Sequence, residues 1–346
     1  MPAFVRMGKC RQVFLPDSFW GRLLALKTFG IQILDNPSLR MLLIISFFVF
    51  AAAFVPAAGS IFLFFLPLIT FFYSAVAGKA KTTAFFLIPV LLIVLFSHFL
   101  QLYIPYQSIL IMGVVGLTIA AVALKNTPIE KTVIYPALII IGAICAYFIY
   151  SGIELSVNPW QMVSRFVAQT IEQNINLSSQ LPLDKEYLDL IKSNKLIFIS
   201  VFTGIFPAVT ITGSIAIVWI NVLMGKSLLG KTAINFPELE GLSRWKAPEF
   251  IIWIFIAASV LLLIKQEQIR VISLNILIII CFIYLLHGFA IIGFLFQNKN
   301  VPVFFRFLFY FLIAVHQFLM IPIVAAGLFD IWVDFRRFIQ KKQASA

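Results

Sequence analysis

Charged residues are scarce in this chain. Only 12% of its 346 residues are Asp, Glu, Lys or Arg, whereas a soluble domain carries about 25%. Hydrophobic residues make up 62% of the chain, and its mean hydropathy is +1.03. A soluble fold cannot bury so much apolar surface. The composition therefore excludes a soluble protein and predicts an integral membrane protein.

Cysteine is also scarce. Cys10, Cys145 and Cys281 are widely spaced and form no CxxC pair, which argues against a disulfide framework or a zinc site. The sequence also lacks GxSxG, Walker A and HExxH motifs, and it has no paired carboxylates within an apolar segment. We therefore expect no enzymatic activity, no metal and no cofactor.

Acidic residues are few. The chain has 14 of them and 26 basic residues, which gives a net charge of +12. In a soluble protein this excess would suggest nucleic acid binding. In a membrane protein it is better explained by basic loops that stay in the cytoplasm and contact anionic lipid. We expect the lipid bilayer, and no nucleic acid, as a partner.

Long apolar runs are abundant. A helix needs about 20 residues, at 1.5 Å each, to span a bilayer, and the runs have roughly this length. They predict an all-α, polytopic transmembrane helical bundle of eight or nine membrane segments. The runs cover residues 41–57, 61–77, 83–104, 107–124, 132–151, 197–223, 248–264, 271–295 and 304–326.

The runs divide the chain into two membrane halves. Five segments form the N-terminal half, 41–151, and the others form the C-terminal half, 197–326. Residues 1–40 are basic and are predicted to be cytoplasmic, with an interfacial helix at 17–34. Residues 327–346 form a basic C-terminal tail.

A polar insert, 152–196, separates the two halves. Asn158 followed by Pro159 is typical of a helix start, and the apolar residues after it recur on one helical face. We expect an extracytoplasmic, amphipathic helical insert that caps the bundle.

Basic residues set the orientation of the first half, because they fall in loops that share one side if the N-terminus is cytoplasmic. The second half is less constrained. The segment 197–223 contains Gly204 and Pro207, and we expect it to be broken or re-entrant. A cytoplasmic C-terminus is favoured, and the number of crossings is left at eight or nine.

Polar residues within apolar segments are the candidate ligand-binding residues, since such residues usually face the bundle interior. Separate interhelical hydrogen bonds are the alternative explanation. The candidates are His98, Gln101, Thr210, Thr212, Ser214, Asn275, His287 and His316.

The stretch "GLFDIWVDFRRF" at 327–338 ends the last apolar run with a group of charges. We predict that it anchors the chain at the membrane surface or contacts a cytoplasmic partner. The anchor candidates are Asp330, Trp332, Asp334, Arg336 and Arg337.

Several stretches carry a family resemblance. They are the short double span "LLIISFFVFAAAFVPAAGSIFLFFLPLITFFYSAVAGKAKT", then "FPELEGLSRWKAPEFIIW", "LNILIIICFIYLLHGFAIIGFL" and "GLFDIWVDFRRF". Over roughly residues 35–340 the chain resembles the YybS-like family of predicted bacterial membrane proteins (domain of unknown function 2232). The N-terminal half of that family is in turn similar to the S components of energy-coupling-factor transporters.

The resemblance implies a multi-pass protein of the bacterial cell (inner) membrane. Its likeness to S components implies a small-molecule binding or transport subunit, with ATPase and coupling subunits as partners. The alternative is a non-catalytic membrane scaffold or assembly factor that binds other envelope proteins.

Overall fold

The computed structural model describes residues 36–55, 58–101, 104–125, 127–179, 185–230, 243 and 245–337. All the regular structure in these residues is helical, which confirms the predicted fold class. The main helices are α2 (Pro37–Phe54), α3 (Gly59–Ala77), α4 (Lys79–Leu100), α5 (Tyr106–Ala123), α6 (Ile129–Glu154), α7 (Pro159–Ser179), α8 (Lys185–Ser193), α9 (Lys195–Leu229), α11 (Ile251–Leu261), α12 (Glu267–Asn298), α13 (Val303–Val315) and α14 (Met320–Val333).

Seven of the described helices are long and apolar enough to cross a membrane, and the number is eight if the bent pair α13–α14 counts as one span. The short apolar helix α11 falls within the predicted segment 248–264. The chain is thus a polytopic helical bundle. The predicted interfacial helix at 17–34 lies outside the described residues.

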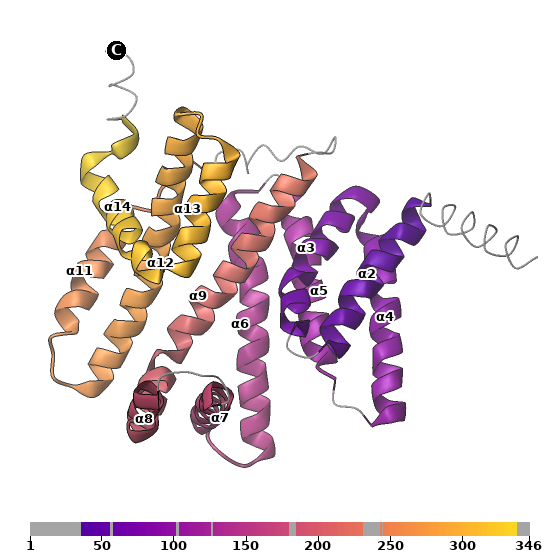
Figure 1. Ribbon diagram of the computed structural model, residues 1–346, viewed down its shortest axis with the longest axis horizontal. Helices are drawn as coiled ribbons and strands as arrows, with labels where there is room; N and C mark the ends of the chain where they lie inside the picture. The colour runs from indigo at the N-terminus through magenta and orange to yellow at the C-terminus, as the bar shows by residue number, and fades with distance from the viewer. Residues whose placement is uncertain are drawn as a thin grey trace, which may run out of the picture.

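Two buried apolar clusters hold the N-terminal half together. The first lies among α2, α3, α4 and α5 around Ile45, Leu66 and Phe86. The second joins α3, α5 and α6 to α9, around Ile119 and Val218. Helix α9 therefore belongs to the first half by its packing, and Figure 1 shows it running obliquely between the two halves.

The prediction that segment 197–223 is broken or re-entrant is wrong, because these residues lie within the continuous helix α9. Pro207 lies inside a continuous helix, although proline lacks the N–H that this helical turn requires. Asn275 of α12 lies beside it: its Nδ2 donates to the Gly204 carbonyl (2.7 Å), and its Oδ1 accepts from the Ala208 N–H (2.9 Å). These bonds satisfy the Gly204 carbonyl and the Ala208 N–H, two backbone groups beside Pro207 that need partners in apolar surroundings.

The break occurs instead in the last apolar run, 304–326, which was predicted as one continuous segment and is sharply bent. The direction of the chain changes by 111° between α13 and α14, across His316 and a short 3₁₀ turn, η2 (Gln317–Leu319). Because the bend exceeds 90°, α14 turns back toward the end at which α13 begins. Figure 1 shows this α13–α14 hairpin with its tip about halfway along the bundle.

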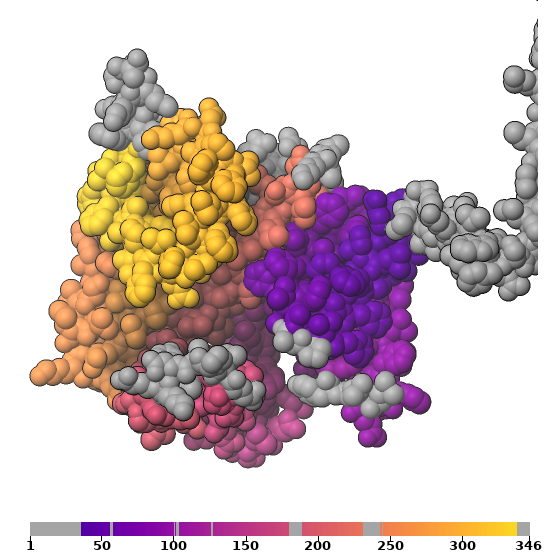
Figure 2. Space-filling model, in the orientation of Figure 1, coloured from indigo at the N-terminus to yellow at the C-terminus, as the bar shows by residue number. Residues whose placement is uncertain are grey.

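The hairpin places the start of α2 and the end of α14 at the same end of the bundle (Figure 1). In Figure 2 the hairpin, in amber and yellow, lies on the outer surface of the C-terminal half. Its second arm, α14, packs against α12.

The insert forms two helices, α7 and α8, at the opposite end of the bundle, where Figure 1 shows them lying across the ends of α6 and α9. The predicted helix start is confirmed, since Asn158 Oδ1 accepts from the Trp160 N–H at 2.8 Å. Val163 and Val167 of α7 are buried against Phe148 and Phe206.

Candidate functional site

The structure does not bring all the predicted ligand-binding residues together. His98 and Gln101 lie exposed at the end of α4. Thr212 and Ser214 on α9 donate to carbonyls one turn earlier, those of Ala208 (2.8 Å) and Thr210 (2.7 Å). These hydroxyls are used within the helix, which is the packing alternative predicted for them.

Thr210 on α9 lines a separate, apolar cavity between α6, α7 and α9, and the other three candidates have three different environments. Asn275 bridges α12 and α9, as described above. His316 is exposed at the tip of the α13–α14 hairpin. His287 is buried within the bundle, with only 1% of its surface exposed, and it is the histidine that meets other charged side chains.

His287 on α12 contacts Asp330 on α14. Their Nε2 and Oδ2 atoms are 3.1 Å apart, and Asp330 is 2% exposed. The other carboxylate oxygen, Oδ1, accepts from the Phe335 N–H at 2.8 Å. Sequence analysis assigned these two residues to different features, a ligand site and a membrane anchor, and the fold joins them in one buried pair.

Two glycines allow this contact. A Cβ atom added to Gly288 would lie 2.2 Å from the Ile323 carbonyl oxygen, and one added to Gly327 would lie 2.1 Å from that of Tyr284. Any larger residue would therefore push α12 and α14 apart. Small residues allow such close backbone approach between membrane helices, and here they bring His287 within reach of Asp330.

Arg336 completes the buried group, which we call the hairpin cluster: His287, Asp330 and Arg336. Arg336 is 6% exposed and donates from Nη2 to the Trp245 carbonyl at 2.8 Å. Burial lowers the pKa of Arg336, and the charges of Asp330 and Asp334 oppose this effect. The residue expected at the membrane surface is therefore part of the protein interior.

Trp245 links the hairpin cluster to the first half of the molecule. Its ring lies edge-on to His287, with centroids 6.2 Å apart, and its Nε1 donates to Glu130 at the start of α6 (2.8 Å). No local sequence pattern indicates this role, because the partners of Trp245 come from three distant parts of the chain: α6, α12 and the C-terminal segment.

Asp334 forms two ion pairs next to the cluster, and they are more exposed than the cluster itself. Its Oδ2 lies 3.3 Å from Lys246 Nζ and 3.4 Å from Arg337 Nε. Burial raises the pKa of Asp334, but the hydrogen bond from Lys246 and the two basic charges outweigh it, so that the pKa lies below its ordinary value. Trp332, also predicted as an anchor, is 62% exposed.

The hairpin cluster has unused hydrogen-bonding capacity. His287 Nδ1 and the Tyr284 hydroxyl are buried without a hydrogen-bond partner among the described residues. The described part of the chain shows no group of three or more His, Cys, Asp or Glu side chains that could hold a metal ion. The arrangement fits a group that holds the hairpin against α12, because the Asp330 carboxylate contacts His287 and attracts the charge of the buried Arg336.

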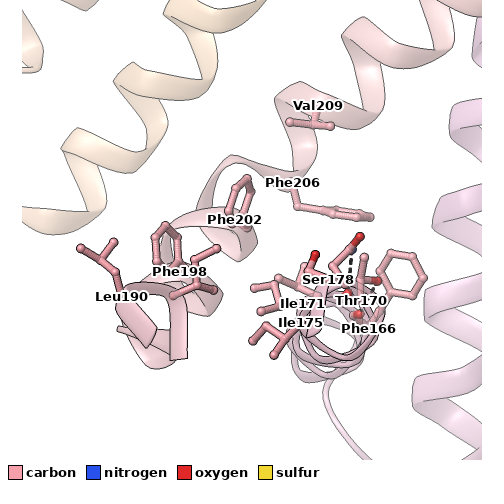
Figure 3. Close-up of a pocket in the computed structure, with 13 residues that line it drawn as sticks. Phe166, Thr170, Ile171, Ile175, Ser178, Leu190, Phe198, Phe202, Phe206 and Val209 are labelled. Carbon is pink, nitrogen blue, oxygen red and sulfur yellow. Dashed lines mark hydrogen bonds between the residues drawn. The ribbon is translucent and has the colours of Figure 1, made fainter. Parts of the chain in front are cut away.

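A large cavity lies at the other end of the bundle, beneath the insert. This α7–α9 pocket has a volume of about 570 Å³, which is within the range of small-molecule sites. Figure 3 shows α7 end-on, with Phe198, Phe202 and Phe206 of α9 beside it. The lining residues are Phe166, Val167, Thr170, Ile171, Asn174, Ile175, Ser178, Leu190, Ile191, Phe198, Phe202, Phe206 and Val209.

Helix α7 presents two kinds of side chain to this pocket. Val167, Ile171 and Ile175 form an apolar row, and Thr170, Asn174 and Ser178 form a polar row, each at intervals of four residues. None of the described lining residues is charged. The pocket therefore has an apolar wall and a strip of neutral polar groups. Two of these groups also donate within α7, the Thr170 hydroxyl to the Phe166 carbonyl (2.9 Å) and the Asn174 amide to the Thr170 carbonyl (2.8 Å), so the Thr170 hydroxyl oxygen and the Asn174 amide oxygen are left as acceptors for a ligand.

An ion pair ties the insert to the bundle beside the pocket. Glu172 of α7 and Lys195 at the start of α9 are 3.1 Å apart. The sequence predicted the amphipathic face of α7 but not the pocket, since the pocket also requires the three phenylalanines of α9, which sequence analysis read as part of a membrane segment.

Neither the curated proteins nor the solved structures contain a significant match to this chain. The fold, a bundle of long apolar helices, agrees with the family whose model matches this chain, and none of these comparisons extends the likeness to S components. That model, described as "Predicted membrane protein (DUF2232)", matches residues 43–331, and the chain therefore belongs to this family of predicted membrane proteins.

Proposed function

We propose that this integral membrane protein binds a small molecule, and that the α7–α9 pocket receives an uncharged amphiphile. The observation that supports this most directly is the pairing of an apolar wall with the neutral polar row of Thr170, Asn174 and Ser178. An alkyl or isoprenoid chain would contact the phenylalanines, and a hydroxyl-bearing head would exchange hydrogen bonds with the polar row. A charged head would find no counter-charge among the described lining residues.

The test is binding of monoolein to the purified protein in lipid nanodiscs, with oleate as the charged comparison. We expect monoolein to bind more tightly, because burying an unpaired carboxylate is costly. Ile175→Trp fills the pocket from α7 and should abolish binding. Leu177→Trp is the matched control on the same helix, since Leu177 is 61% exposed and does not line the pocket.

Equal binding by the Ile175→Trp and Leu177→Trp variants would refute the pocket as the site. Absence of monoolein binding, together with lipid-extraction mass spectra that show no enriched neutral amphiphile, would refute the binding function. That result would favour the second function predicted from the sequence, a membrane scaffold or assembly factor that binds other envelope proteins. Transport with ATPase and coupling subunits remains a prediction of the S-component resemblance.

We also infer that the end of the bundle where α2 begins faces the cytoplasm of a bacterial cell. Basic residues gather at this end, while the insert and the α11–α12 link at the other end mix basic with acidic residues. A fluorescent protein fused to the C-terminus should therefore be fluorescent inside the cell, and an alkaline phosphatase fused there should be inactive. The described basic residues at the inferred cytoplasmic end are Arg40, Lys79, Lys81, Lys125, Lys131, Lys226, Lys246, Lys299, Arg306, Arg336 and Arg337.

A further inference from the structure

The tip of the α13–α14 hairpin exposes polar groups where lipid is expected. His316 and Gln317 are both exposed, and no hydrogen bond joins either side chain to another described residue. Phe318, the next residue, is 84% exposed. Here the chain changes direction by 111° and leaves regular α-helical geometry.

The tip lies deep in the apolar layer. Arg306 near the start of α13 donates to the carbonyls of Val301 and Phe296, and such a residue belongs near the headgroups. His316 follows ten residues later, which on a helix is about 15 Å. This distance is half the thickness of a hydrocarbon core of about 30 Å. Figure 1 agrees, since it shows the tip about halfway along the bundle.

Non-helical backbone and polar side chains are not stable in contact with lipid at this depth. Irregular segments there are buried in protein or line a water-filled cavity, and uncovered polar side chains are costly. None of the four described cavities is lined by His316 or Gln317. The described residues therefore leave the tip uncovered, and a further protein surface would satisfy it.

We propose that this surface is the hairpin tip of a second copy of the chain, packed around a two-fold axis. An imidazole and a primary amide each carry a donor and an acceptor. A two-fold arrangement pairs His316 of each copy with Gln317 of the other, so that one contact is made twice. The exposed side chains of Val315, Phe318 and Ile321 lie at the tip and next to it, and they supply an apolar contact of the same symmetry.

Disulfide cross-linking in native membranes tests the proposal. A variant with Ser in place of Cys10, Cys145 and Cys281 provides the background, and Phe318→Cys is introduced into it. A residue beside a two-fold axis meets its own counterpart, so copper phenanthroline should convert this variant into a dimer of twice 39.1 kDa. Leu91→Cys is the control, because Leu91 is 61% exposed in the middle of α4, in the other half of the molecule.

Three outcomes would overturn the proposal. The first is that the dimer forms equally in the Leu91→Cys control, or that neither variant forms it. The second is cross-linking of Phe318→Cys to a different protein. The third is labelling of Phe318→Cys by a membrane-impermeant maleimide, which would place the tip in a water-filled cavity.

Replacing the polar pair provides a second measurement. His316→Leu with Gln317→Leu removes two hydrogen bonds from each dimer and also makes the uncovered tip compatible with lipid. We expect the dissociation constant in nanodiscs or micelles to rise at least about eightfold, the equivalent of about 1.2 kcal/mol. An unchanged or lower constant would overturn the role of the pair, and retention of the dimer by His316→Asn, which keeps a donor and an acceptor, would support it.

Discussion

Asp330→Asn replaces one oxygen of a buried carboxylate and removes its negative charge from the hairpin cluster. The new amide can keep the bond that Oδ1 accepts from the Phe335 N–H. It cannot offset the charge of Arg336, which is 6% exposed, and it no longer presents a carboxylate oxygen to His287 Nε2 at 3.1 Å. The substitution therefore isolates the electrostatic part of the contact between α12 and α14.

The size of the effect follows from the burial of the three side chains. Removing one partner of a buried pair typically costs about 3–5 kcal/mol, because the other charge stays buried without compensation. Since the amide retains one hydrogen bond, we expect a loss of about 3 kcal/mol of unfolding free energy. Asp330→Ala also leaves the Phe335 N–H unpaired and should cost about 1 kcal/mol more.

Reversible unfolding in mixed dodecyl maltoside and SDS micelles, followed by tryptophan fluorescence, measures the change. Asp334→Asn is the control, because the Asp334 side chain is 28% exposed and pairs with Lys246 and Arg337 near the surface. Such pairs contribute at most about 1 kcal/mol. If Asp330→Asn unfolded within about 0.5 kcal/mol of the wild type, as surface substitutions do, the cluster would not hold the hairpin.

Three further predictions concern other contacts. Gly327→Ala places a methyl group 2.1 Å from the Tyr284 carbonyl oxygen and should separate α14 from α12, which a lower thermal midpoint and increased maleimide labelling of Cys281 would show. Asn275→Leu removes two interhelical hydrogen bonds and leaves the Gly204 carbonyl without this partner, so the unfolding free energy should fall by about 1 kcal/mol; no loss would mean that the turn is satisfied in another way. The pKa of Asp334 is lowered in the folded chain, so its carboxylate stabilises the fold at pH values above the unfolded pKa of about 3.9. This contribution is lost as the pH falls through the lower folded pKa. The stabilities of wild type and Asp334→Asn, measured by unfolding at decreasing pH, should therefore converge at low pH.

Sequence reasoning located the helices because hydrophobicity determines which segments can cross a membrane. It failed where a single side chain from another helix decided the outcome. Pro207 suggested a break in 197–223, but the helix continues through it, and Asn275, far away in the sequence, bonds the neighbouring Gly204 carbonyl and Ala208 N–H. The run at 304–326 appeared uninterrupted because His316 and Gln317 are two polar residues among many apolar ones.

The two candidate sites show the same limit. His287 and Asp330 were each recognised as unusual, since both are polar residues next to or within apolar segments. Their pairing depends on the close approach of Gly288 and Gly327, which no local pattern predicts. The amphipathic face of α7 was predictable from its periodicity, whereas the pocket required knowledge of which apolar side chains lie opposite.

The length of α9 has a consequence for how a ligand would reach the pocket. Its 35 residues extend about 52 Å, well beyond the hydrocarbon thickness of about 30 Å even with some tilt. The phenylalanines of α9 that line the pocket lie within about its first three turns, where a helix of this length would reach the headgroup layer. An amphiphile would enter by lateral diffusion within one leaflet, and its occupancy would follow its mole fraction among the lipids rather than its concentration in water.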